Sequence, residues 1–147
     1  MADVMLRTGG PADHDEIMRI WREASRIGHP FLSEADLDAQ ERITRKEHLP
    51  QANLVVAERA GRIVGFIATV EDYIGALFVA PQAQGSRVGR RLIEDAQARS
   101  TSLQLGVYEA NLVARAFYER LGFVQLGRTH HDDEGRWLPV VRLGWRP

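Results

Sequence analysis

The sequence predicts a single α/β domain, and three observations support this. The chain has 147 residues, the length of one domain, and 44% of them are hydrophobic, enough for a sizeable core. Helix-like patterns alternate with short β-rich runs along the whole length. We find no linker, repeat or low-complexity segment. One compact domain spanning residues 1–147 is therefore expected.

Composition excludes several classes of protein. A formal net charge of -1, with charges dispersed along the chain, gives no long-range field that would recruit nucleic acid or an acidic membrane. The absence of cysteine excludes disulfide scaffolds, thiolate zinc sites and a cysteine nucleophile. The N-terminus lacks the apolar region of a signal peptide, and no stretch approaches 18 apolar residues. We therefore expect a soluble cytoplasmic protein.

The first helices are predicted from spacing and capping. Residues 11–26 carry an apolar stripe at three- and four-residue spacing, which predicts a helix: Ile17, Ile20, Trp21 and Ala24. Ser33 and Asp36 predict a capped start for a second helix. That helix is markedly polar through residue 46, so we expect it on the surface, able to move as a lid.

The middle of the chain predicts a hairpin and one further strand. Residues 53–58 and 63–70 are β-rich runs on either side of a tight turn at residues 60–62. Residues 73–79 continue the same sheet. A small-residue loop and a helix start follow at residues 81–93. Backbone N–H groups of such a loop converge with the positive end of the helix dipole, so this arrangement suits a phosphate.

Two standard phosphate-binding motifs are excluded at this loop. It lacks the Gly-Lys-Ser/Thr ending of a Walker loop, and it lacks the three glycines of a dinucleotide fingerprint. An ordinary tight turn remains an alternative interpretation, because small residues before a helix also serve that purpose.

The last third of the chain predicts a strand, a short helix and a hairpin. Residues 103–107 form the strand, and Asn111 and Gly122 mark the two ends of the helix. Residues 124–129 and 138–143 flank the polar loop at residues 130–135, which predicts a terminal hairpin.

Two motifs together resemble the GCN5-related N-acetyltransferase (GNAT) family. The family loop Gln/Arg-x-x-Gly-x-Gly/Ala is matched in order by Gln84, Gly85, Ser86, Arg87, Val88 and Gly89. The later pattern Asn-x-x-Ala-x-x-Phe-Tyr-x-x-x-Gly-Phe is matched by residues 111–123. Residues 5–13 and the Gly-His-Pro-Phe-Leu segment at residues 28–32 also resemble small bacterial members.

The resemblance covers nearly the whole chain and implies a fold and an activity. The fold is α/β (α+β), with a central, twisted, mixed but mostly antiparallel sheet of six to seven strands and about four helices. The activity is transfer of an acetyl group from acetyl-CoA to a primary amine, by direct attack in a ternary complex. The amine belongs to a protein lysine, a protein N-terminus or a small molecule. No metal, nucleic acid or membrane is implied, and the protein is expected as a monomer or homodimer.

The resemblance also assigns coenzyme contacts. They fall on the backbone of the fourth strand, on the loop and on the last helix: Leu77, Phe78, Val79, Gln84, Gly85, Ser86, Arg87, Val88, Gly89, Arg90, Asn111 and Tyr118. Arg87 stands where the family has glycine. An arginine at positive φ costs about 1 kcal/mol, so the loop uses an ordinary φ there or tolerates strain. Guanidinium groups of Arg87, Arg90 or Arg91 reach the coenzyme phosphates or remain solvated.

Tyr118 is the predicted general acid, because it matches the family tyrosine near the coenzyme sulfur. The alternative is an aromatic packing pair formed with Phe117. Asn111 is either a coenzyme contact or a helix cap, and its different atoms allow it to be both.

The sequence offers several candidates for the general base. Some family members carry a glutamate on the fifth strand where this chain has Gly106. His29 and Glu109 are the preferred candidates, followed by Glu71, Asp72 and a water chain. The alternative readings are a surface carboxylate at Glu109 and a loop-orienting ring at His29.

The polar loop before the last strand contains His130, His131, Asp132 and Asp133, whose spacing matches no recurring metal site. With Tyr73, Trp21, Phe31 and Trp137, these residues are expected to shape acceptor choice. Two other functions stay open: a coenzyme-A-binding sensor without turnover, and a β-rich interaction domain that binds no coenzyme.

Overall fold

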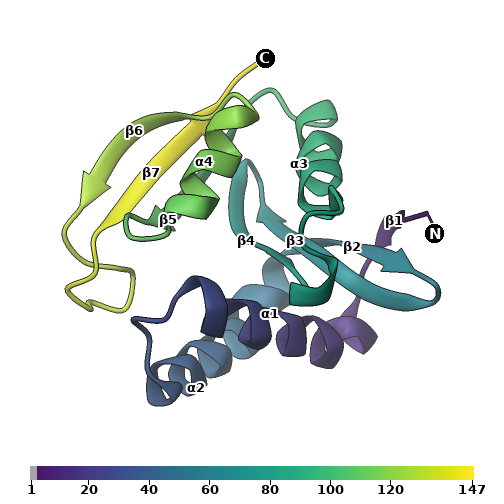
Figure 1. Ribbon diagram of the computed structural model, residues 1–147, viewed down its shortest axis with the longest axis horizontal. Helices are drawn as coiled ribbons and strands as arrows, with labels where there is room; N and C mark the ends of the chain where they lie inside the picture. The colour runs from purple at the N-terminus through teal and green to yellow at the C-terminus, as the bar shows by residue number, and fades with distance from the viewer. Residues whose placement is uncertain (1–2) are drawn as a thin grey trace.

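The computed structural model describes residues 3–147 (Figure 1). The elements of the first half are β1 (Met5–Thr8), η1 (Pro11–Asp13), α1 (His14–Gly28), α2 (Glu34–Ile43), η2 (Thr44–His48), η3 (Leu49–Gln51), β2 (Asn53–Arg59), β3 (Arg62–Val70) and β4 (Tyr73–Val79). The elements of the second half are η4 (Pro81–Ala83), α3 (Val88–Ala98), β5 (Leu103–Tyr108), α4 (Leu112–Arg120), β6 (Val124–Thr129) and β7 (Val140–Trp145). Within residues 3–147, no helix has both the length and the apolar character needed to cross a membrane.

The strands form one seven-stranded sheet in the order β1-β2-β3-β4-β5-β7-β6. Only the central pair, β4 and β5, is parallel, and every other neighbouring pair is antiparallel. The predicted fold class, a mixed and mostly antiparallel sheet with about four helices, is therefore confirmed. The predicted hairpin is formed by β2 and β3, which turn at Ala60 and Gly61, both with positive φ.

Strands β4 and β5 separate after a single register pair. A single register pair, Tyr73 with Gln104, joins β4 to β5 in residues 3–147. The Ala80 N–H donates to the Val64 carbonyl of β3, at 2.8 Å. Because hydrogen-bonding direction alternates along a strand, the main-chain groups of Leu77 and Val79 face the β5 side. The sheet thus presents a row of main-chain groups to the gap beyond the first pair.

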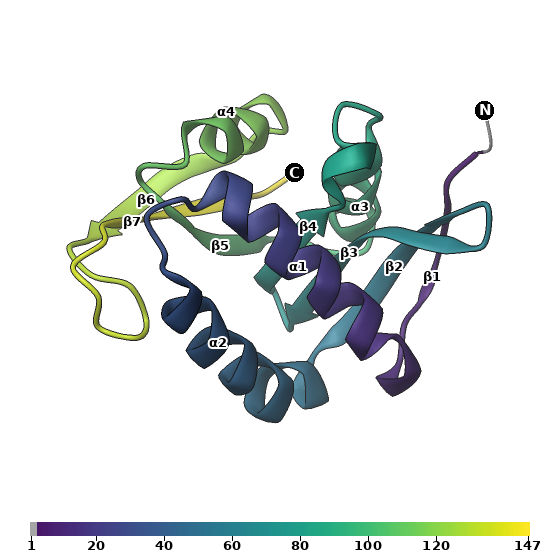
Figure 2. The same ribbon diagram turned by 60° about the horizontal axis from the view of Figure 1, so that its bottom comes forward.

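Helices cover both faces of the sheet around this gap. A Cβ added at Gly65 would meet Val88 and Leu92 of α3, whereas the next residue, Phe66, lines a cavity with Met18 and Trp21 of α1. Successive strand residues point to opposite faces, so α1 and α3 pack on opposite sides of β3. Figure 2 shows α2 continuing along the α1 side, and α3 and α4 together on the other.

The final strand differs from its predicted position. It begins at Val140, two residues later than expected. Pro139 has no N–H to donate to the ladder, and its carbonyl accepts from the Glu109 N–H at 2.9 Å instead. The polar loop is therefore longer than the sequence predicted, and Leu138 packs at the edge of the core.

Candidate active site

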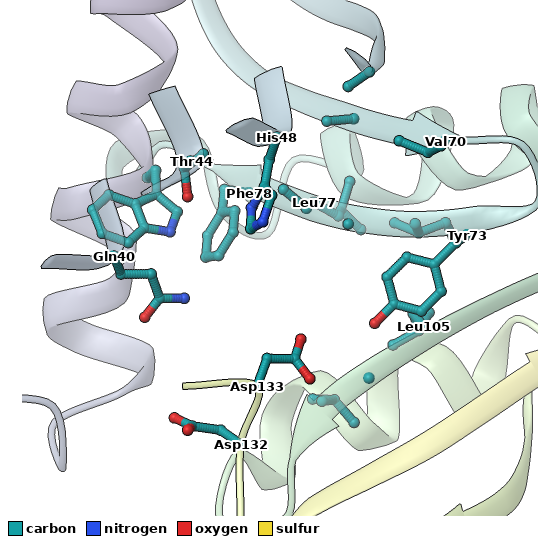
Figure 3. A pocket seen from close by; sticks show the side chains of 18 of the residues that line it. Gln40, Thr44, His48, Val70, Tyr73, Leu77, Phe78, Leu105, Asp132 and Asp133 are labelled. Atoms are coloured by element: carbon teal, nitrogen blue, oxygen red, sulfur yellow. The ribbon is translucent and has the colours of Figure 1, made fainter. Parts of the chain in front are cut away.

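A cavity of about 400 Å³ lies where β4 and β5 separate. One wall is formed by Asn111, at the N-cap of α4, and by Ala114 and Tyr118 of α4. The opposite wall comes from α2, η2 and the β6–β7 loop, and includes Gln40, Thr44, His48, Asp132 and Asp133 (Figure 3). Leu77 and Phe78, two predicted coenzyme contacts, form its floor on β4. The cavity therefore reaches from one side of the sheet to the other.

The loop between β4 and α3 has the geometry of an anion cradle. Gly85 has φ +83 and a Cβ there would meet nothing within 4 Å, so the backbone is open to an approaching ligand. The first hydrogen bond of α3 runs from Arg91 N to Arg87 O. No acceptor in residues 3–147 pairs with the N–H groups of Gly89 and Arg90, as expected for a first helical turn. These N–H groups and the helix dipole favour an anion.

Of the two conformations left open for Arg87, the structure has the strained one, with φ +67 and ψ +14 at the N-cap of α3. Neighbouring arginines are occupied, because Arg90 pairs with Glu94 and Arg91 donates to the Val4 carbonyl. No carboxylate in residues 3–147 pairs with Arg87. Its guanidinium thus remains available beside the cradle.

Two of the predicted coenzyme contacts in the loop have side chains that already form hydrogen bonds with nearby backbone carbonyls. The Gln84 amide donates to the Val79 carbonyl at 3.3 Å, and the Ser86 hydroxyl donates to the Ala83 carbonyl. Val88 is fully buried in the core, whereas Gly89 lies against the Phe117 ring, 3.3 Å from where a Cβ would stand. A side chain at Gly89 would therefore press α3 away from α4.

Tyr118 lies in the cavity wall with only 7% of its surface exposed. Its ring packs edge-on against Phe117 and Phe123, so the packing role weighed from sequence is real. Burial raises the pKa of its phenol, which keeps the hydroxyl protonated at neutral pH. Desolvation makes this phenol a weaker acid, so it donates its proton only to negative charge that develops beside it in the same buried space, such as the charge on a departing thiolate sulfur.

Asn111 joins the start of α4 to the end of α1. Its Oδ1 accepts from the Ala114 N–H at 3.2 Å, the expected cap, and its Nδ2 lies 3.2 Å from His29 Nε2. The rings of Phe31, Phe78 and Tyr108 surround the imidazole. Burial lowers the pKa of His29 to about 4. His29 is thus neutral at pH 7, and the nitrogen that would accept a proton already faces the Asn111 amide.

The half-buried His29 predicts a pH-dependent stability. Its pKa is about 4 in the folded protein and near 6.5 when unfolded, so the unfolded state binds more protons between these values. The free energy of unfolding should therefore fall as pH drops from 6.5 to 4, by up to about 3 kcal/mol from this group. Urea unfolding at several pH values, compared with His29→Gln, isolates the effect. Parallel pH profiles for the two proteins would contradict it, and His130→Gln, an exposed histidine, serves as control.

The predicted carboxylate candidates for the base lie outside the cavity. Glu109 forms a two-point ion pair with Arg128, which lowers the pKa of the carboxyl group. Glu71 occupies the exposed β3–β4 turn at φ +54, and Asp72 accepts from the Ser102 hydroxyl at 3.2 Å. None of the three lines the cavity, so the structure does not bring them to Tyr118.

Asp132 organises the β6–β7 loop. Its Oδ2 accepts from the Tyr108 hydroxyl at 2.9 Å and from Arg136 Nη1 at 3.0 Å, while its Oδ1 accepts two backbone N–H groups of the loop. Arg136 continues to Asp36 of α2, with Nε 3.1 Å from Oδ1. Burial alone would raise the pKa of Asp132, but these hydrogen bonds outweigh it and lower the pKa. The loop is thereby held against both β5 and α2.

Sequence reasoning missed several cavity residues. Gln40 belongs to the polar segment that was expected on the surface, able to move as a lid, and His48 follows that segment, yet both side chains line the cavity (Figure 3). The sequence also did not distinguish the role of Asp132 from that of Asp133. Figure 3 shows the Asp132 carboxylate turned away from the centre of the cavity and the Asp133 carboxylate pointing into it. A tight turn that reverses direction between adjacent residues leaves no periodic signal for this.

Comparison with known proteins adds to this geometry. Residues 24–142 match the family described as acetyltransferase (GNAT) domain. Peptidyl-lysine N-acetyltransferase YjaB of Escherichia coli K12 is 32% identical over 97% of both chains. The solution structure of its apo form aligns with a TM-score of 0.87 over 97% of both chains. PaiA N-acetyltransferase of Thermoplasma acidophilum, solved in complex with coenzyme A, shares the fold at 15% identity, with a TM-score of 0.80 over 99% of both chains.

Proposed function

Because the chain belongs to the GNAT acetyltransferase family and is an acyltransferase, we propose that this single domain moves the acetyl group of acetyl-CoA to a primary amine. The amine attacks directly, with both substrates bound together. The relatives named peptidyl-lysine N-acetyltransferases make a protein lysine the first acceptor to test. Protein N-termini and small-molecule amines present the same chemical group.

The observation that carries the proposal is the cavity between the parted strands. The anion cradle at the start of α3 lies at the end of β4, and the Leu77 and Val79 main-chain groups face the gap. A pyrophosphate fits the cradle, and an extended chain with amide groups fits alongside these main-chain groups. Tyr118 lies beyond them in the cavity wall. The residues present therefore suit coenzyme A from its phosphates to its thiol.

The thioester supplies an already activated acyl group, so the protein needs proximity and proton transfer. Tyr118 donates a proton to the departing thiolate sulfur. Leu77 and Val79 orient the acyl carrier through the main chain, and Asn111 fixes the start of α4 beside it. A lysine-like amine is neutral only about once in 10³ to 10⁴ molecules at pH 7, so the acceptor must also lose a proton. His29 is engaged by Asn111 and Glu109 by Arg128, so we assign neither as the base, and the proton of the acceptor leaves through water.

Calorimetric titration with acetyl-CoA, using dephospho-CoA and ADP as controls, tests the coenzyme half of the proposal. Micromolar binding with thermal stabilisation is expected. A second assay follows free thiol release with lysine peptides, blocked and unblocked at the N-terminus, and with polyamines. Saturable transfer above the hydrolysis background supports the enzyme. Binding without transfer to any amine would favour the coenzyme sensor, and the absence of binding would overturn both.

Replacing Arg87 separates its strain from its charge. Arg87→Gly removes an L side chain from φ +67, so we expect stability to change by less than about 1 kcal/mol, because the gain offsets the more flexible unfolded chain. Loss of the free guanidinium should weaken acetyl-CoA binding by roughly 3- to 10-fold at low salt. Calorimetry at two salt concentrations measures this, and Arg87→Lys is the matched variant that keeps the charge. Equal affinities in all three proteins would show that Arg87 is only solvated.

A further inference from the structure

Gly106 leaves a space in the cavity wall that another residue fills. It lies on β5 and lines the cavity without a side chain. A Cβ built there would stand 3.1 Å from Val140 Cγ1 and 3.5 Å from the Tyr73 hydroxyl oxygen. Tyr73 comes from the start of β4, the one point at which β4 and β5 are still paired. The phenol hydroxyl therefore occupies the direction in which a side chain at residue 106 would project.

Asp133 faces the same space from the β6–β7 loop. In Figure 3 its carboxylate and the Tyr73 hydroxyl both point into the cavity. Burial and then the Asp133 charge raise the pKa of Tyr73, and the Gly106 main chain acts in the opposite direction. Asp133 makes no hydrogen bond or ion pair with any of residues 3–147. Its acceptor atoms are thus available to a ligand.

The surrounding wall favours a ligand that carries positive charge and N–H donors. Glu47, Asp132, Asp133 and Glu134 line the cavity, whereas no lysine or arginine of residues 3–147 does. The Gln40 side-chain oxygen is buried there without a hydrogen-bond partner. Leaving such an atom unsatisfied is costly, so an N–H donor that enters the cavity is favoured at this position.

We propose that the Tyr73 hydroxyl and the Asp133 carboxylate bind the ammonium group of a cationic acceptor in the cavity, next to Gly106. The inference rests on the proposed acetyl transfer and names the residues that select its acceptor. Asp133 accepts a charge-assisted hydrogen bond from the ammonium, and the Tyr73 oxygen accepts a second one. The pair holds the nitrogen near the parted strands, where proximity to the acyl group is gained. The ammonium loses one proton to water before attack, and the neutral amine that results is the nucleophile.

Neighbouring carboxylates do not meet the same requirements. Asp132 has four hydrogen bonds and is turned away from the cavity centre. Glu134 lies 3.6 Å from Arg136 Nη1, which competes for its charge. Glu47 is on the exposed η2 segment at the cavity rim. Asp133 alone combines an available carboxylate with the Tyr73 hydroxyl.

The test compares acceptors in Asp133→Asn, Tyr73→Phe and the double variant. One acceptor is an N-terminally blocked lysine peptide, which is cationic at pH 7, and the other is an aromatic amine, which is uncharged. We expect Asp133→Asn to lower kcat/KM for the peptide roughly 10- to 100-fold, mainly through KM, and to change kcat/KM for the aromatic amine less than about 3-fold. Asp3→Asn removes the same charge before β1, at the far edge of the sheet, and is the control.

Each outcome bears on a different claim. Loss confined to the cationic acceptor, with unchanged acetyl-CoA affinity and a double variant less impaired than the sum predicts, supports the Tyr73–Asp133 pair. Equal kcat/KM for the peptide in wild type and both single variants overturns the pair and leaves the proposed transfer standing. Equal losses for both acceptors also overturn it, since they show a general defect. Failure of the wild-type protein to bind acetyl-CoA overturns the proposed function, and the pair with it.

Discussion

Tyr118→Phe should lower kcat by about 10²- to 10³-fold while leaving the Kd for acetyl-CoA unchanged. The variant removes one hydroxyl from a buried ring whose aromatic neighbours, Phe117 and Phe123, are kept. General acids contribute this order of rate, and no hydrogen bond from the hydroxyl to residues 3–147 is lost. Stopped-flow measurement of thiol release gives the rate of transfer, and calorimetry gives Kd.

The packing alternative makes a different prediction for Tyr118. If the ring served only the core, Tyr118→Phe would keep both the rate and the melting temperature, and only a truncation such as Tyr118→Ala would lower the latter. A kcat within about 3-fold of wild type, with chemistry shown to limit the rate, would remove the hydroxyl from the mechanism.

Asp132→Asn should destabilise the protein by about 2 to 4 kcal/mol and lower its melting temperature by roughly 5 to 12 °C. The amide cannot neutralise Arg136, and one of its atoms becomes a donor where Tyr108, Arg136 and the backbone all require an acceptor. Only 4% of the Asp132 side chain and 17% of that of Arg136 are exposed, so water does little to compensate. Chemical denaturation at pH 7 measures the change.

The neighbouring carboxylate supplies the matched control. Asp133→Asn removes the same charge one residue later, where no ion pair is lost, and should change stability by less than about 0.5 kcal/mol. The folded pKa of Asp132 is lowered, so its stabilisation is present above pH 4 and is lost as pH falls through the folded pKa. The gap between Asp132→Asn and wild type should therefore shrink in strong acid. A constant gap would show that the carboxylate charge is not responsible.

Local patterns were enough to predict most elements of this fold. Ser33 and Asp36 form the reciprocal cap expected of them, and the apolar stripe of α1 is buried through Ile17 and Ile20. These features depend on interactions within a few residues, which a sequence displays directly. The start of β7 was misplaced because Leu138 and Pro139 extend the apolar run, but the Leu138 N–H donates to the Arg136 carbonyl and Pro139 has no N–H to donate.

The candidate site was only partly predictable, because it is assembled from distant segments. The loop and Tyr118 were accessible through a family pattern, and the structure places Tyr118 in the cavity wall and the loop between β4 and α3. The surroundings of His29 could not be predicted in this way, because they include the rings of Tyr108 and Phe78, which come from two strands far away in the sequence. Nor does a sequence reveal that Arg136, 100 residues after Asp36, ties the loop to α2. Such long-range polar contacts carry no periodicity.

The single pairing between β4 and β5 divides the sheet mechanically into two half-sheets. Strands β1–β4 are joined by ladders of several residue pairs, some with a bulge, and so are β5–β7, whereas, within residues 3–147, a single register pair joins the two groups. Sub-global opening should therefore begin at this seam, where that one pairing and side-chain packing resist it. A ligand whose own amides lie in the gap would supply main-chain hydrogen bonds that the sheet lacks there. Ligand binding would then also hold the two half-sheets together.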